Sequence, residues 1–128
     1  YKAEKILEEH SDQLDKATES RLLHMEFDLR NLLFQKEDIA VVDWEMAAAG
    51  DPLLDLVITE KRLVWRQNQS QEIKQSLRKG YKTVREIEDS PELEKLYEIF
   101  QMTRLLLIHQ EDKEMVKKIK KSSRELFT

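Results

Sequence analysis

The strongest constraint on the fold is a series of four amphipathic stretches in the second half of the chain. Apolar residues recur in them at helical spacing, and in the first of them Leu54, Ile58 and Trp65 broaden the apolar face, so we expect that helix to be buried on several sides. The four predicted helices cover residues 52–66, 70–88, 91–109 and 112–127. The first opens on Asp51, a good capping residue, with Pro52 at the first helical position, and the third opens on Ser90 and Pro91 with Glu92. This pattern predicts a chain that is mainly helical.

The first half of the chain predicts one more helix and a small β component. Residues 3–17 have one apolar helix face, and residues 21–24 are typical of a short strand. The apolar run 31–34 and the β-branched run 39–44 flank a polar turn, which predicts a β-hairpin. We therefore predict an α+β fold, mainly helical, with about five helices and a small β-hairpin. A length of 128 residues fits a single domain.

Composition excludes several classes of protein. The formal net charge of -4 gives no basic footprint for nucleic acid, and the longest apolar runs are far too short to span a membrane. The chain has no cysteine, which excludes disulfides and thiolate metal sites, and we predict a cytoplasmic location. Gly50 and Gly80 are its only glycines, whereas a glycine-rich phosphate loop needs several close together. If this protein binds a nucleotide, a different polypeptide segment must supply the loop that covers the phosphates.

Polar residues interrupt the apolar runs between residues 24 and 55 in a way that indicates a site. Glu26, Asp28 and Asn31 fall in one loop between two predicted strands, and Asp43 ends the second strand of the hairpin. Carboxylates and an amide brought together by a hairpin suit a hard cation such as magnesium. They also suit a base that orients a hydroxyl for attack on phosphate.

Three motifs in this stretch, at matching spacing, resemble the aminoglycoside phosphotransferase and choline kinase family. They are His24-x-Glu26 followed by Asn31, then Val42-Asp43-Trp44-Glu45, then Gly50-Asp51-Pro52-Leu53-Leu54-Asp55-Leu56. The resemblance implies a kinase-like C-lobe that transfers phosphate from ATP or GTP to a small-molecule hydroxyl, with magnesium as cofactor. A cationic alcohol, such as an aminoglycoside or a choline-like compound, would suit the acidic loop.

The resemblance also implies roles for individual residues. Asn31 and Asp43 would hold magnesium, and the acidic residue Glu26 would accept or orient the substrate hydroxyl. His24 would brace the catalytic loop. Asp55 would accept hydrogen bonds from the loop backbone and so support its shape.

The chain departs from the family pattern in the catalytic loop. Glu26 stands where the family has Asp, and a misplacement of about 1 Å can cost on the order of 100-fold in rate. Met25 replaces a glycine, and Asp28 replaces a frequent histidine, so Asp28 is a second candidate for the catalytic base. Only 23 residues precede His24, which leaves no room for an N-lobe.

We therefore predict that residues 1–128 form a single kinase-like C-lobe domain without its N-lobe, inactive by itself as an enzyme. Nucleotide binding would need the missing lobe. The apolar surface that normally meets that lobe predicts either an N-lobe partner or self-association. The alternative hypothesis is a non-catalytic kinase-like or helical protein-interaction module. No nucleic acid or membrane partner is expected.

Overall fold

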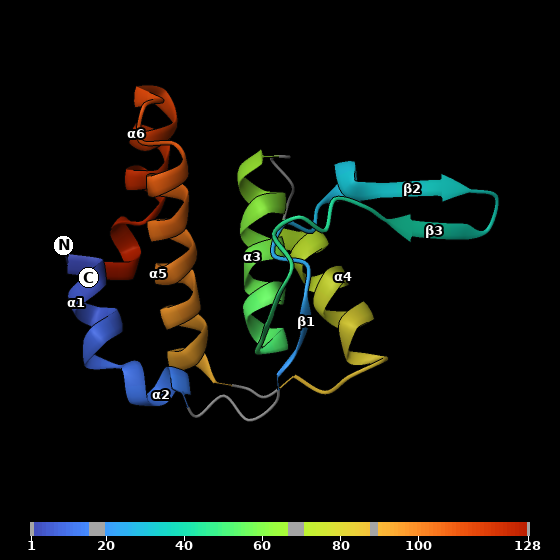
Figure 1. Ribbon diagram of the computed structural model, residues 1–128, viewed down its shortest axis with the longest axis horizontal. Coiled ribbons are helices and arrows are strands. Elements are labelled where there is room, and N and C mark those ends of the chain that lie inside the picture. The colour runs from blue at the N-terminus through green and yellow to red at the C-terminus, as the bar shows by residue number, and fades with distance from the viewer. Residues whose placement is uncertain (1, 16–19, 67–70, 88–89, 128) are drawn as a thin grey trace. The chain divides into compact units, whose positions relative to one another are not determined.

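The computed structural model describes residues 2–15, 20–66, 71–87 and 90–127 (Figure 1). The chain divides into two compact units. One unit combines Tyr1–Lys16 with Ser90–Thr128, and the other is the continuous segment Ala17–Asp89. Helices dominate the described residues, which confirms the prediction of a mainly helical α+β fold. Among these residues, no helix combines the length and apolar character needed to cross a bilayer.

The unit that contains both chain ends is built around one long helix. Its elements are α1 (Lys2–Glu9), α2 (Ser11–Asp15), α5 (Pro91–Ile108), α6 (Lys113–Ser122) and the 3-10 helix η2 (Arg124–Phe127). α1, α6 and η2 each pack against α5. Asp112 caps α6, since its Oδ1 accepts from the backbone N–H groups of Glu114 and Met115 at 3.1 and 2.9 Å.

Two predicted helices of this unit are interrupted. The predicted helix 3–17 divides at His10 into α1 and α2, and its last two residues lie outside the described residues. At the division, the carbonyl of Ile6 accepts from both the backbone N–H and the ring Nδ1 of His10. The predicted helix 112–127 gives way to η2 after Ser123, whose hydroxyl donates to a carbonyl of the preceding turn at 3.2 Å. Such side-chain hydrogen bonds compete with the helical backbone pattern.

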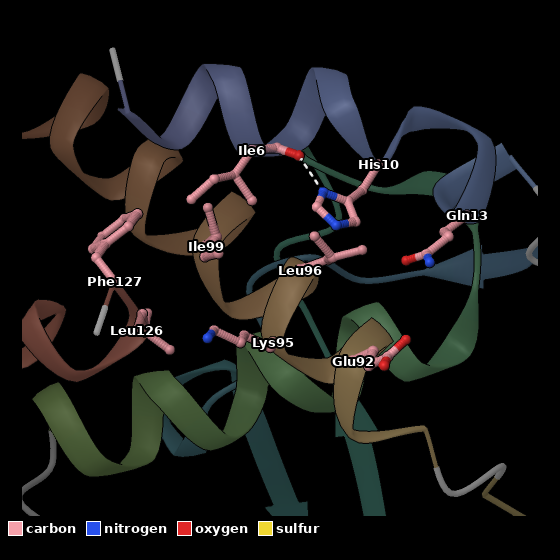
Figure 2. A pocket seen from close by; sticks show the side chains of 9 residues that line it. All are labelled: Ile6, His10, Gln13, Glu92, Lys95, Leu96, Ile99, Leu126 and Phe127. Carbon is pink, nitrogen blue, oxygen red and sulfur yellow. Dashed lines mark hydrogen bonds between the residues drawn. The ribbon is translucent and has the colours of Figure 1, made fainter.

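A pocket of about 500 Å³ lies within this unit (Figure 2). Its walls come from α1, α2, α5 and η2 and combine apolar side chains with polar ones. The lining residues are Ile6, His10, Gln13, Glu92, Lys95, Leu96, Ile99, Leu126 and Phe127. None of the site residues predicted from the sequence is among them.

The other unit carries the strands and the predicted site. Its elements are β1 (Arg21–Leu23), the 3-10 helix η1 (Leu29–Asn31), β2 (Leu32–Gln35), β3 (Asp38–Val41), β4 (Ala48–Gly50), α3 (Pro52–Arg66) and α4 (Gln71–Lys82). The strands form two separate two-stranded antiparallel sheets, β1 with β4 and β2 with β3. The predicted β-hairpin is therefore present as β2 and β3, with Gln35 opposite Asp38 across its turn.

The pairing of β1 with β4 was not predicted, because residues 47–52 have the composition of a loop. Leu23 lies opposite Ala48, and Arg21 lies opposite Gly50. A Cβ atom on Gly50 would lie 2.9 Å from Cδ1 of Leu23, closer than side chains normally approach. Glycine at this position therefore allows β4 to approach the buried Leu23 side chain.

α3 forms the support behind the predicted site. Asp51 caps it, with Oδ1 accepting from the backbone N–H of Leu53 at 2.9 Å. The buried side chain of Ile58 on α3 clusters with Leu23 and Met25, which links the helix to β1 and the loop that follows. Burial of an apolar side chain of this size contributes about 1.5–3 kcal/mol.

α4 is shorter than the predicted helix 70–88, whose first and last residues lie outside the described residues. It ends at Lys82 because Thr83 closes a turn on the carbonyl of Gly80, with its backbone N–H at 3.2 Å and its hydroxyl at 2.7 Å. α4 packs on α3. Arg78 of α4 forms an ion pair with the buried Glu60 of α3, which keeps that carboxylate compensated.

Candidate functional site

The loop after β1 is held by a carboxylate on the first turn of α3. Oδ2 of Asp55 accepts from the backbone N–H of His24, and Oδ1 accepts from that of Met25, both at 2.8 Å. Met25 has a φ of 69°, a left-handed conformation that favours glycine. Asp55 therefore stabilises a loop backbone that turns sharply away from its strand.

His24 joins this loop to the segment after β3. Its Nε2–H donates to the carbonyl of Val42 at 2.8 Å, while Nδ1 accepts from the backbone N–H of Glu26 at 3.2 Å. These partners assign the neutral imidazole with its proton on Nε2. The ring is buried, and it lies edge-on against Trp44 with centroids 4.7 Å apart. Both ring nitrogens are hydrogen-bonded to backbone groups, so His24 links the loop at Glu26 to the segment at Val42.

Asn31 closes the same loop from its other end. Its side-chain Nδ2 donates to the backbone carbonyl of Glu26 at 2.9 Å. The backbone carbonyl of Asn31 accepts from the backbone N–H of Val42, also at 2.9 Å. Within the described part of the chain, Oδ1 of Asn31 makes no hydrogen bond. The amide is thus oriented by its nitrogen, which leaves its oxygen for an external partner.

Three carboxylates converge beside this loop. Glu26, Asp43 and Glu45 each offer an oxygen, and these oxygens all lie within 4.8 Å of one another. Asp43 and Glu45 are exposed, and Glu26 is half-buried. Asp43 has a φ of 64°, which turns the chain out of β3 and explains why the predicted strand 39–44 stops at Val41.

Glu45 was quoted in a sequence motif but was not assigned a role. Its separation from Asp43 by a single residue was the available signal. Whether that spacing brings the two carboxylates together depends on the local backbone, and here the turn at Asp43 does so.

Asp28 has different surroundings from Glu26, although both are acidic residues of one loop. Its side chain is 0% exposed. Oδ2 accepts from Arg62 Nη2 and from Arg30 Nη2, both at 2.7 Å, and Oδ1 accepts from the backbone N–H and Nε of Arg30 at 2.9 and 3.3 Å. Burial by itself raises the pKa of Asp28, but the hydrogen bonds from Arg30 and Arg62 outweigh it and hold that pKa well below its ordinary value.

Arg62 is a site residue that the sequence reasoning missed. It lies on α3, seven residues after Asp55 and therefore on the same helix face. Its side chain is 5% exposed, and Nη1 lies 3.8 Å from Oε1 of Glu26. The helical spacing from Asp55, together with the need of a buried carboxylate for a cation, was the signal that could have found it.

The comparisons with known proteins identify the family. A model of the phosphotransferase enzyme family matches residues 2–97, which include α1, all four strands, α3 and α4. No curated protein and no solved structure gives a match. The family match covers well over half of the chain and confirms the resemblance inferred from the three motifs. This chain belongs to the phosphotransferase enzyme family.

Proposed function

We propose that this chain is the carboxylate-bearing C-lobe of a small-molecule kinase. The complete enzyme would transfer the terminal phosphoryl group of a nucleoside triphosphate to a hydroxyl of its substrate. The observation that carries the proposal is the convergence of the Glu26, Asp43 and Glu45 carboxylates within 4.8 Å. Membership of the phosphotransferase enzyme family supports the same chemistry.

The donor atoms of this site fit a magnesium ion. Carboxylate and amide oxygens are the hard ligands that Mg²⁺ prefers, and it uses few of them when phosphates share the coordination. We assign Asn31 and Asp43 as ligands and add Glu45, which lies beside Asp43. When bound, the ion would neutralise the charge that develops on the nucleotide phosphates.

Glu26 is assigned to the acceptor hydroxyl, because its side chain is 21% exposed whereas that of Asp28 is fully buried. In the transfer, the substrate oxygen bonds to the terminal phosphorus as the bond from that phosphorus to the bridging oxygen breaks. The hydroxyl proton passes to Glu26, and the nucleoside diphosphate leaves with the bonding electron pair. Asp28 is assigned a supporting role, because it is buried and both of its oxygens hold arginine donors.

The nucleotide requires a second element. The chain contains no glycine-rich stretch that could cover phosphates, so an N-lobe would supply that loop and select ATP or GTP. We propose that the chain alone is inactive for this reason. The alternative is a non-catalytic kinase-like binding module, and the specific observation in its favour is Glu26 at the acceptor position, where the related family has Asp.

A magnesium titration followed by thermal unfolding tests the proposal. At a magnesium concentration tenfold above the dissociation constant, binding stabilises the folded chain by about 1.4 kcal/mol. That corresponds to a rise in Tm of about 4–8 °C for a small domain. Asp43→Asn is expected to abolish the rise.

Glu37→Gln is the matched control, since it removes one exposed carboxylate of the same unit at the hairpin turn, away from the cluster. It is expected to keep the rise in Tm. A wild-type chain that does not respond to millimolar magnesium, with or without nucleotide, would favour the binding module over the kinase lobe.

A further inference from the structure

Arg62 is the buried cation that contacts both acidic residues of the catalytic loop. Its Nη2 donates to Oδ2 of Asp28 at 2.7 Å, and its Nη1 lies 3.8 Å from Oε1 of Glu26. Nε has no hydrogen-bond partner within the described residues. The guanidinium is therefore positioned by the two carboxylates, and it spans them with two different nitrogen atoms.

Asp28 holds one end of the Arg62 guanidinium. Its carboxylate is fully buried and is also bound by Arg30, whose own side chain is largely exposed. A buried carboxylate without its cations is costly, so Arg62 is held firmly at Asp28. Its second nitrogen is then presented to Glu26 by a rigid helix, not by a loop.

We propose that Arg62 is a positioning residue that restrains Glu26 and keeps its carboxylate out of the metal-ligand set. This inference rests on the proposed function. Glu26 lies close enough to Asp43 and Glu45 to join them around a cation. A metal bound by Glu26 would be brought toward the positive guanidinium, and the two cations repel each other. Glu26 therefore stays available for the acceptor hydroxyl, and the metal is bound by Asp43, Glu45 and Asn31.

The chemistry of the two acidic side chains fits this role. The side chain of Glu26 has one more rotatable bond than aspartate, so it needs an additional restraint to hold one geometry. Asp28 supplies the anchor for the arginine that provides this restraint. Lysine at position 62 could not replace it, because a single ammonium group cannot span both carboxylates as the planar fork does.

Binding of Mn²⁺ to the 128-residue chain, measured by calorimetry and by the loss of the free-ion resonance signal, tests this inference without any catalytic assay. Arg62→Lys keeps the net charge and the pairing with Asp28 but moves the positive charge away from Glu26. It is expected to raise the affinity for Mn²⁺ at least threefold. Arg30→Lys is the matched control, because Arg30 also pairs with Asp28, and it is expected to stay within twofold of the wild type.

Glu26→Gln distinguishes an effect of the contact between Arg62 and Glu26 from an effect of net charge on Mn²⁺ binding. By itself it is expected to leave the Mn²⁺ affinity within twofold, and in combination with Arg62→Lys it should remove the threefold gain. If Arg62→Lys fails to fold by circular dichroism, the pair Asp28→Asn with Arg62→Gln retains a hydrogen bond and the net charge while releasing Glu26. The same gain in affinity is expected from that pair.

The outcomes distinguish this inference from the proposed function. Loss of affinity in Glu26→Gln to the level of Asp43→Asn, or wild-type affinity in the variants that release Glu26, overturns the role of Arg62 and leaves the metal site intact. If Asp43→Asn fails to lower the Mn²⁺ affinity at least tenfold, the metal site itself is refuted, and the proposed function with it.

Discussion

Replacement of Asp28 by alanine should be among the most destabilising single changes in this chain. The substitution leaves the guanidinium of Arg62, which is 5% exposed and already has an unpartnered Nε, without its 2.7 Å acceptor. Breaking a buried ion pair by removal of one partner costs about 3–5 kcal/mol. The hydrogen bonds from Arg30 are lost as well, but its side chain is 59% exposed and is hydrated once Asp28 is removed, so it adds little further penalty of a buried unpaired charge.

Urea unfolding followed by circular dichroism measures this effect. A loss of 3–5 kcal/mol lowers the urea midpoint by about 1–5 M. Glu37→Ala, an exposed carboxylate of the same unit, is the control and should change stability by less than about 0.5 kcal/mol. Combining Asp28→Ala with Arg62→Ala should cost less than the two single losses together, with a coupling of about 1–3 kcal/mol.

The same carboxylate should make stability depend on pH in the acid range. Its pKa is about 3.8 in an unfolded chain and lies well below that in the fold, so the folded state binds fewer protons there. The stabilisation is therefore complete above the unfolded value and is lost as the pH falls through the folded value. Asp28→Asn should flatten this part of the acid-unfolding curve. A curve that keeps its wild-type slope below pH 4, or a coupling below about 0.5 kcal/mol in the double variant, would refute the reasoning.

Two further predictions concern the backbone around the site. Asp55→Ala leaves the N–H groups of His24 and Met25 without acceptors and should cost about 1–3 kcal/mol for each group that stays buried, with loss of amide-exchange protection confined first to this loop. Gly50→Ala places a Cβ 2.9 Å from Leu23 and should cost about 1–3 kcal/mol by overpacking. The smaller side chain of Leu23→Val should recover part of that loss in urea unfolding, and equal stability of Gly50→Ala and the wild type would contradict the close approach.

Local patterns located the helices and the hairpin, although they did not predict the interruptions at His10 and after Ser123. The Asp51–Pro52 start of α3 and the β2–β3 pairing are decided by neighbouring residues, through a cap and a short turn. The pairing of β1 with β4 was not accessible in the same way, because Ala48–Gly50 has no β-branched or alternating pattern. That strand exists because it lies against β1, so its formation is a tertiary effect.

The candidate site shows the same division. Motif spacing identified His24, Glu26, Asn31, Asp43 and Asp55 as one group, because their order and separation reflect how a loop, a hairpin and a helix start succeed one another. It gave Glu26 the catalytic position and left Asp28, only two residues away and also acidic, as a second candidate for the same role.

Only the tertiary structure separates these two carboxylates. It places Asp28 against Arg62, 34 residues further along the chain, and leaves Glu26 partly open beside Asp43 and Glu45. The physical reason is that the ionic state and accessibility of a carboxylate depend on the charges and solvent around it in space. A linear pattern can show which acids are present, but the packing of α3 against the loop decides which of them is enclosed with an arginine.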